Sequence, residues 1–142
     1  MSISKDMLEV SEYNGEGYKP LVDFNVWRLA VLNYIDELLP ERLDSMQRHD
    51  ETDEVFVLLK GRCILFLGSG DEAVSQVFAE DLLPLKFYNV KKGCWHTHTL
   101  SPDATVLVVE NCDTSKLNST LTSLDSAQRA KLAQLAALLW KS

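Results

Sequence analysis

The sequence lacks the features that mark several classes of protein. Its 142 residues include three cysteines and no CxxC pair, which argues against a disulfide framework and against a zinc-thiolate knuckle. We expect Cys63, Cys94 and Cys112 to be reduced thiols. No apolar run is long enough for a membrane-spanning helix. No repeat, low-complexity tract or Ser/Gly linker divides the chain, so we expect a single domain.

Positive charge is also scarce. The chain has 14 Lys and Arg against 21 Asp and Glu, a formal net charge of -7, and it has no basic stripe. This balance repels phosphate backbones, so we expect no nucleic-acid partner, although a cleft can still attract a small anionic ligand. The first six residues, MSISKD, lack the basic-then-apolar order of a secretory signal. We therefore expect a cytoplasmic protein with no membrane association.

The hydrophobic residues that are present, 46% of the chain, suffice for one core. Apolar and β-branched runs between turn signals predict short strands, which favour a sandwich or barrel. We expect Lys60 and Gly61 to form a bend or bulge between two continuing strands, and the segment 68–71 to close a hairpin. The predicted strands cover residues 26–34, 54–59, 62–67, 73–78, 87–90, 94–100 and 105–111.

The end of the sequence has a different pattern. Asp125 and Gln128 have the spacing of a helix capping box, and leucines recur after them at helical spacing. This pattern predicts a helix that packs one apolar face on the barrel or on a second subunit; its leucines are Leu132, Leu135, Leu138 and Leu139. The domain organisation we expect is an N-terminal extension over 1–25, a β-barrel over 26–115 and the C-terminal helix over 122–141.

All three histidines fall in two short segments, QRH at 47–49 and WHTH at 95–98. On a strand, His96 and His98 point to the same face. Glu54 opens a very apolar run, where a buried carboxylate needs a partner. Two imidazoles and a carboxylate in one cavity can bind a divalent metal or perform acid–base chemistry. The alternative is a hydrogen-bonded histidine pair on a solvated face.

These segments resemble the two sequence motifs of the cupins. The first motif is H-x-H, four residues, E, six residues and G, and the matching positions are Gln47, His49, Glu54 and Gly61. The second is P-x-G-x-x-H-x-x-x-N, and the matching positions are Lys91, Gly93, His96 and Leu100. The chain departs from the family at Gln47, Lys91 and Leu100. The resemblance extends over about residues 26–111.

The resemblance implies an all-β fold, a cupin-like double-stranded β-helix or jelly-roll barrel followed by the C-terminal α-helix. It makes His49, Glu54 and His96 candidate ligands of a divalent metal (Zn, Mn, Fe or Ni), with Gln47 in the place of the first histidine. Because Gln is a weak neutral ligand, His98 is a candidate to complete the set. The resemblance implies no nucleotide cofactor. Cupins are commonly dimers, which predicts a homodimer through the helix and the segment before Val26.

Four further residues are candidates for binding a substrate. Arg48 and Lys92 have the charge to hold a carboxylate or phosphate, Trp95 can form a pocket wall, and Glu110 can act as a base. Each has a plainer alternative. Arg48 is also consistent with a surface cation, Lys92 with a solvated turn, Trp95 with the core, and Glu110 with a salt bridge at a strand end.

Two functions remain open at this point. The first is a small enzyme of the lyase or isomerase kind that acts on a polar metabolite bearing a carboxylate or hydroxyl group, with His96, His98 and Glu54 as its catalytic residues. The segments 49–61 and 95–98 also resemble ureidoglycolate lyase, which belongs to this class. The second is a sensor or storage protein that binds a small molecule without turnover. The clustered His and Glu residues favour the first function, and Gln47 favours the second.

Overall fold

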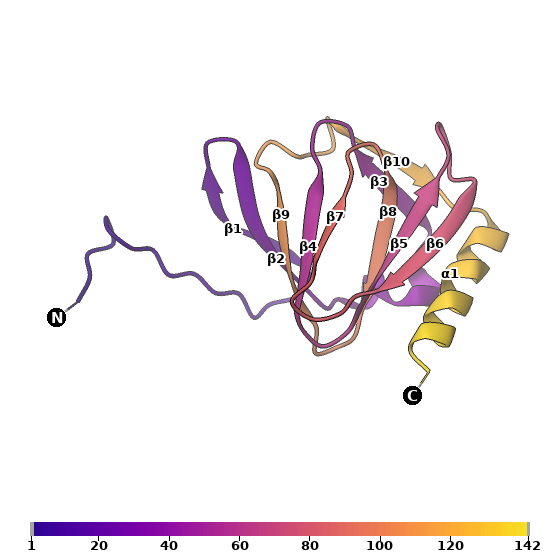
Figure 1. Ribbon diagram of the computed structural model, residues 1–142, viewed down its shortest axis with the longest axis horizontal. Coiled ribbons are helices and arrows are strands. Elements are labelled where there is room, and N and C mark those ends of the chain that lie inside the picture. The colour runs from indigo at the N-terminus through magenta and orange to yellow at the C-terminus, as the bar shows by residue number, and fades with distance from the viewer. Residues whose placement is uncertain (1, 142) are drawn as a thin grey trace.

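The structure is a computed structural model that describes residues 2–141. Two five-stranded sheets face each other and form a barrel, and all their strand pairs are antiparallel (Figure 1). The first sheet has the order β1 (Tyr18–Phe24), β2 (Trp27–Asn33), β9 (Thr105–Asn111), β4 (Glu54–Lys60), β7 (Phe87–Val90). The second has the order β10 (Ser119–Ser123), β3 (Ser45–His49), β8 (Trp95–Leu100), β5 (Cys63–Ser69), β6 (Gln76–Asp81).

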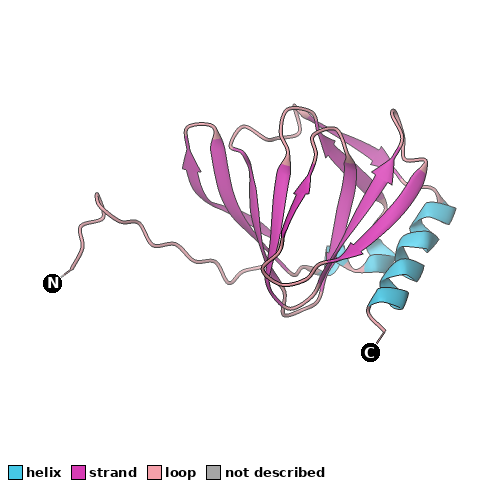
Figure 2. Cartoon of the chain, viewed as in Figure 1, coloured by secondary structure: helices cyan, strands magenta, loops and turns pink. Residues whose placement is uncertain are grey.

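Strands predominate, as Figure 2 shows, and the predicted all-β jelly-roll class is confirmed. Helical structure consists of two 3-10 turns, η1 (Asp36–Leu38) and η2 (Pro40–Arg42), and one α-helix, α1 (Ser126–Leu139). No helix within residues 2–141 is long and apolar enough to cross a membrane.

Three strands, β1, β3 and β10, lie outside the predicted strand ranges. β3 has the mostly polar sequence SMQRH and is an interior strand of the second sheet. β1 falls inside the segment expected to be an N-terminal extension, and β10 is the polar segment STLTS. Both are edge strands, which need fewer apolar residues because one side faces solvent. β1 also contains Pro20, and its pairing with β2 shifts register between Pro20 and Val22, as expected for a proline that cannot donate a ladder hydrogen bond.

The turn at Gly61 corrects a second expectation. The strands before and after it do not continue in one sheet, because β4 belongs to the first sheet and β5 to the second. Gly61 has φ +72°, and a Cβ at this position would lie 2.5 Å from Ala104 Cα. Only glycine fits such a left-handed turn against neighbouring backbone. The turn takes the chain from one wall of the barrel to the other.

The core has two parts, on either side of the second sheet. Inside the barrel, Cys63 and Leu65 of β5 pack with Phe56 and Val106 from the first sheet. The alternate residues of β5 face the other way, toward α1. β5 is therefore buried on both faces, which explains its continuous apolar sequence CILFLG.

The helix α1 packs on the barrel of its own chain, beside β6 (Figure 1). The predicted capping box is present: Gln128 N donates to Asp125 Oδ1 at 2.8 Å, and Asp125 N donates to Gln128 Oε1 at 3.0 Å. Leu132 is buried, but Leu138 is 64% exposed. The prediction that Leu138 belongs to the packed face of the helix was wrong, because the buried residues of α1 are Leu132 and Ala136.

Candidate metal centre

A cavity of about 800 Å³ opens between the two sheets. Strand alternation turns Gln47 and His49 of β3 into it, together with His96 and His98 of β8 from the same sheet. The facing sheet contributes Glu54, the first residue of β4, and Glu110, near the end of β9. The end of β3 and the start of β4 therefore meet the start of β8 and the end of β9.

Backbone contacts hold the two motif segments together beside this cavity. Gly93 N donates to the carbonyl of His49 at 2.8 Å, and Lys92 N donates to Asp53 Oδ1 at 2.8 Å. These bonds tie the turn before β8 to the loop that joins β3 to β4. The hydrogen bond from Lys92 N is the main reason that the pKa of Asp53 lies below its ordinary value. These bonds lie beside His49 and Glu54, the two candidate ligands of the first motif.

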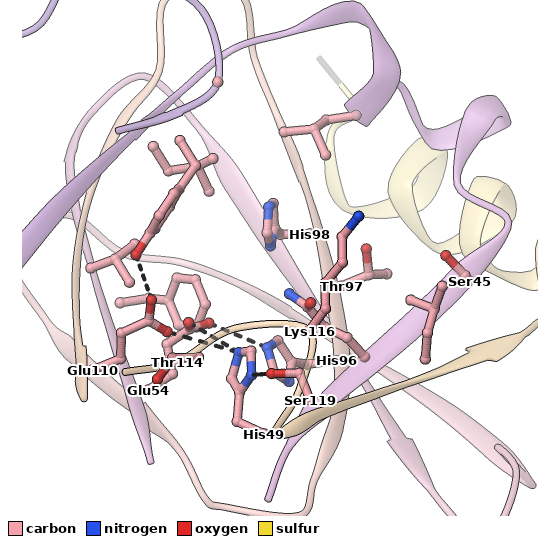
Figure 3. Close-up of a pocket in the computed structure, with 18 of the residues that line it drawn as sticks. Ser45, His49, Glu54, His96, Thr97, His98, Glu110, Thr114, Lys116 and Ser119 are labelled. Atoms are coloured by element: carbon pink, nitrogen blue, oxygen red, sulfur yellow. Dashed lines mark hydrogen bonds and ion pairs between the residues drawn. The ribbon is translucent and has the colours of Figure 1, made fainter. Parts of the chain in front are cut away.

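Three buried side chains converge on one point of the cavity. His49 Nε2 lies 3.2 Å from Glu54 Oε2, and His96 Nε2 lies 3.2 Å from Glu54 Oε1. One ligand atom from each residue lies within 4.8 Å of the other two. Figure 3 shows the two imidazoles turned toward the Glu54 carboxylate. This is the grouping that the two sequence motifs predict.

The hydrogen bonds of the two rings show which nitrogen is free. His96 Nδ1 lies 3.0 Å from the carbonyl oxygen of Cys94, and a carbonyl can only accept, so Nδ1 carries the hydrogen. His49 Nδ1 lies 2.7 Å from Ser119 Oγ. Both Nε2 atoms are buried without a hydrogen-bond partner in residues 2–141. With the hydrogen on Nδ1, Nε2 of a neutral ring carries a lone pair, and in His96 this lone pair faces Oε1 of Glu54.

Two acceptors face each other in this arrangement, so the site needs a positive species between them. Two imidazole nitrogens and a carboxylate form a donor set suited to a divalent transition metal, and Nδ1 contacts of the kind seen here orient metal-binding histidines. The residues present therefore fit a metal ion. Burial raises the pKa of Glu54, but its contacts with His49 and His96 lower it more, and the result lies well below the ordinary value.

Glu110 lies beside this group. Tyr18 Oη donates a hydrogen bond to Glu110 Oε1, and Glu110 Oε2 lies 3.9 Å from His49 Nε2. Burial first, and then the neighbouring carboxylate of Glu54, raise the pKa of Glu110 to about 8. Burial and the bond to Glu110 raise the pKa of Tyr18. Of the four candidates for substrate binding, Glu110 is the one that lines the cavity.

His98 also lines the cavity but stands apart from the three converging residues (Figure 3). Two residues along a strand span about 7 Å, too far for both histidines of the second motif segment to reach one ion easily. The His98 ring packs against Phe56 at 5.9 Å between centroids, and burial lowers its pKa to about 4. The ring is therefore neutral near pH 7.

The two nitrogens of His98 differ in their surroundings. Nδ1 is buried without a partner among the residues that the structure describes. A buried N–H without a partner costs more than a bare ring nitrogen, so the favoured tautomer carries its hydrogen on Nε2. His98 can donate this hydrogen to a molecule in the cavity.

Gln47, in the place of the first motif histidine, lies opposite His96 in the β3–β8 pairing and lines the cavity. The other three substrate-binding candidates lie outside it. Arg48 packs over the Trp95 ring, 4.5 Å from its centroid, and Trp95 is buried in the core under α1. Lys92 is an exposed turn residue. Arg48 and Trp95 each precede a histidine that points into the cavity. Because side chains alternate along a strand, Arg48 and Trp95 lie on the opposite face of the sheet.

Several cavity residues have no counterpart in the sequence motifs. Tyr18 and Arg28 come from β1 and β2, and Ser119 comes from β10. Lys116 reaches the cavity from the loop between β9 and β10 (Figure 3). Their placement depends on long-range strand pairing, for example Arg28 opposite Glu110. No local sequence signal marks them.

No protein-family model and no curated protein matches the sequence. Solved structures do resemble the chain. A cupin 2 domain-containing protein from Halorhodospira halophila is 14% identical over 94% of this chain and 86% of its own, with a TM-score of 0.52. BH2720 from Bacillus halodurans is 12% identical over 87% and 86%, with a TM-score of 0.53. PAC13 from Streptomyces, a variant solved with uridine, is 10% identical over 84% and 88%, with a TM-score of 0.55. At such identities the likeness is one of fold.

Proposed function

The chain has the cupin fold, and on that premise we propose that it is a metal-dependent enzyme of the lyase or isomerase kind. Its substrate is a small polar metabolite bearing a carboxylate or hydroxyl group. The observation that carries the proposal is the pair of buried Nε2 atoms, on His49 and His96, that face the Glu54 carboxylate without a hydrogen bond. A divalent ion bound by these donors would polarise an oxygen of the substrate.

The residues around this centre have distinct tasks. His49, Glu54 and His96 hold the ion, and Ser119 and the Cys94 carbonyl orient the two rings. His98 donates its Nε2 hydrogen to the substrate from the opposite part of the cavity. Tyr18 and His98 line the cavity near the ion ligands, and each is neutral and carries a proton near pH 7. Proton transfer during the reaction is assigned to these two residues.

The cavity also favours a substrate with negative charge. Arg28 and Lys116 line it, and they are its cationic side chains apart from histidine in the described range 2–141. A chain with net charge -7 that brings two cations to one cavity can attract an anionic metabolite there, because the field in a cleft is local. The likeness to ureidoglycolate lyase rests on two sequence segments, and that substrate remains a prediction from the sequence alone.

A metal analysis tests the first part of the proposal. Protein purified without chelators should contain close to one divalent ion per chain. His96→Ala should lose the ion, whereas His98→Ala should keep it, because His98 stands apart from the three ligands. Equal metal content in wild type and His96→Ala would contradict the proposed centre.

An incubation with a pool of hydroxy, keto and ureido acids tests the second part. The wild type should consume one compound, the chelated protein should spare it, and His98→Ala should consume it more slowly while retaining metal. Gln47 in place of a histidine favours a second candidate, binding without turnover. Capture of a compound that is released unchanged would support that candidate and refute the enzyme.

A further inference from the structure

Glu110 has one carboxylate oxygen committed and one free. Oε1 accepts the hydrogen bond from Tyr18, whereas Oε2 is buried and has no hydrogen-bond partner in the described part of the chain. The free oxygen is aimed at the converging group: it lies 3.9 Å from His49 Nε2, the same atom that lies 3.2 Å from Glu54 Oε2 (Figure 3). Tyr18 thus holds Glu110 in a position where its second oxygen faces a ring nitrogen with no partner.

Two buried carboxyl groups meet at this point. Glu54 and Glu110 are buried and in contact with each other, and two adjacent carboxylates in a low-dielectric site repel unless a proton or cation lies between them. Arg28, which also lines the cavity, has its Nε 3.0 Å from Asp23 Oδ1. A divalent cation would offset both carboxylates, while His49 and His96 bind it as neutral rings.

The separations measured from His49 Nε2 also suit a shared ion, with Glu110 just outside the group of His49, Glu54 and His96 whose ligand atoms all lie within 4.8 Å of one another. Two atoms that each lie about 2.1 Å from one ion are separated by about 3 to 4.2 Å, depending on the angle between them. The separations of His49 Nε2 from Glu54 and from Glu110, 3.2 and 3.9 Å, both fall in this interval. The separation of His96 Nε2 from Glu54, 3.2 Å, does so too.

We propose that Glu110, from β9 and outside both sequence motifs, is the fourth protein ligand of the metal, completing a set of two histidines and two glutamates that Gln47 does not complete. This inference rests on the metal centre of the proposed function. Carboxylate-rich sets favour harder ions than imidazole-rich ones, so the site should prefer Mn²⁺ or Fe²⁺ more than a three-histidine site would. The substitution of the motif histidine by Gln47 is then compensated from the facing sheet.

The test is a titration with Co²⁺, followed by calorimetry and by visible absorption of the bound ion. Glu110→Gln keeps the shape of the side chain and removes its charge. It should weaken Co²⁺ binding by more than about 100-fold and change the visible spectrum, because one ligand is lost. Gln47→Ala should weaken binding less than Glu110→Gln does and should leave the visible spectrum unchanged, because Gln47 is outside the proposed ligand set. Glu37→Gln is the matched control, because Glu37 is a carboxylate that lines the same cavity.

The outcomes separate this inference from the proposed function. Failure of the wild type to bind Co²⁺ would refute both. Normal binding by Glu110→Gln would refute the fourth ligand and leave the centre of His49, Glu54 and His96 intact. Weaker binding with an unchanged spectrum would also refute it, since Glu110 would then act through Glu54. If Glu110→Gln does not fold, Glu110→Asp keeps the charge but withdraws the oxygens, and it should give an altered spectrum; an unaltered one would refute the inference.

Discussion

Metal binding should raise the thermal stability of this chain by a calculable amount. The candidate ligands come from β3, β4 and β8, and β8 is far from the other two strands along the chain. The unfolded chain therefore does not hold the three side chains together. An ion that binds only the folded state adds about 2.7 kcal/mol to the free energy of unfolding at a free concentration of about 100 times its Kd. For a chain of 142 residues, about 4 °C per kcal/mol gives a rise of roughly 10 °C in the unfolding temperature.

Circular dichroism of chelated protein, with and without added Mn²⁺ or Co²⁺, measures this rise. His49→Ala and His96→Ala should show almost none of it at the same metal concentration. His98→Ala should show the full rise, because its ring lies outside the converging group while sharing the cavity. An equal rise in His49→Ala and wild type would mean that the ion binds elsewhere, and a lost rise in His98→Ala would place His98 among the ligands. Either result would refute the reasoning from the geometry.

Three further predictions concern the fold and the assembly. In a denaturant titration, Gly61→Ala should lower the free energy of unfolding by at least about 2 kcal/mol, because the substitution adds the cost of a left-handed backbone to a clash with Ala104. Gly93→Ala is the control, since Gly93 has φ +80° but no atom lies within 4 Å of the new Cβ. It should lower the free energy of unfolding by about half as much. Burial raises the pKa of Cys63 to about 12, so a thiol reagent at pH 8 should label this thiol only after unfolding. As the pH rises, the thiol of the unfolded chain ionises first, from about pH 8.5, so the contribution of Cys63 to the free energy of unfolding should fall above that pH. This fall should be absent in Cys63→Val. The chain, of 16.0 kDa, should form a homodimer through the segment before Val26, where Met7 and Val10 are 80% and 84% exposed. Light scattering should report a monomer after removal of residues 2–12. A truncated chain that still had the mass of a dimer would exclude this contact.

The sequence predicted the fold and the metal group through different kinds of information. Apolar and β-branched runs between turn signals located β7 and β9 to the residue and β2, β4 and β8 to within about one residue. The resemblance to the cupin motifs identified His49, Glu54 and His96. His49 and Glu54 are close along the chain, whereas His96 joins them through the pairing of β3 with β8. β1 and β10 were missed because edge strands need little apolar sequence, and β3 was missed because its sequence, SMQRH, is mostly polar. Tyr18 and Lys116 were missed with the strand and the loop that carry them.

The positions of Arg48 and Trp95 follow from the alternation of side chains along a strand. Each is one position from an inward-facing histidine, so each has to point to the outer face of the second sheet, where Arg48 covers Trp95. Chemical suitability for a ligand had made them candidates, and strand geometry excludes them from the cavity. Glu110 is the opposite case, because it lies at even spacing from the buried Val106 and Val108, shares their inward face and lines the cavity.

The distribution of the ligands over the two sheets gives the metal centre a structural meaning as well as a chemical one. His49 and His96 belong to neighbouring strands of the second sheet, whereas Glu54 and Glu110 belong to neighbouring strands of the first. His49 Nε2 and His96 Nε2 each lie 3.2 Å from Glu54, so the two pairs already meet across the barrel. An ion bound by the proposed set of four side chains would add a further link between the two sheets at this place, and the gain in unfolding temperature described above would measure its strength.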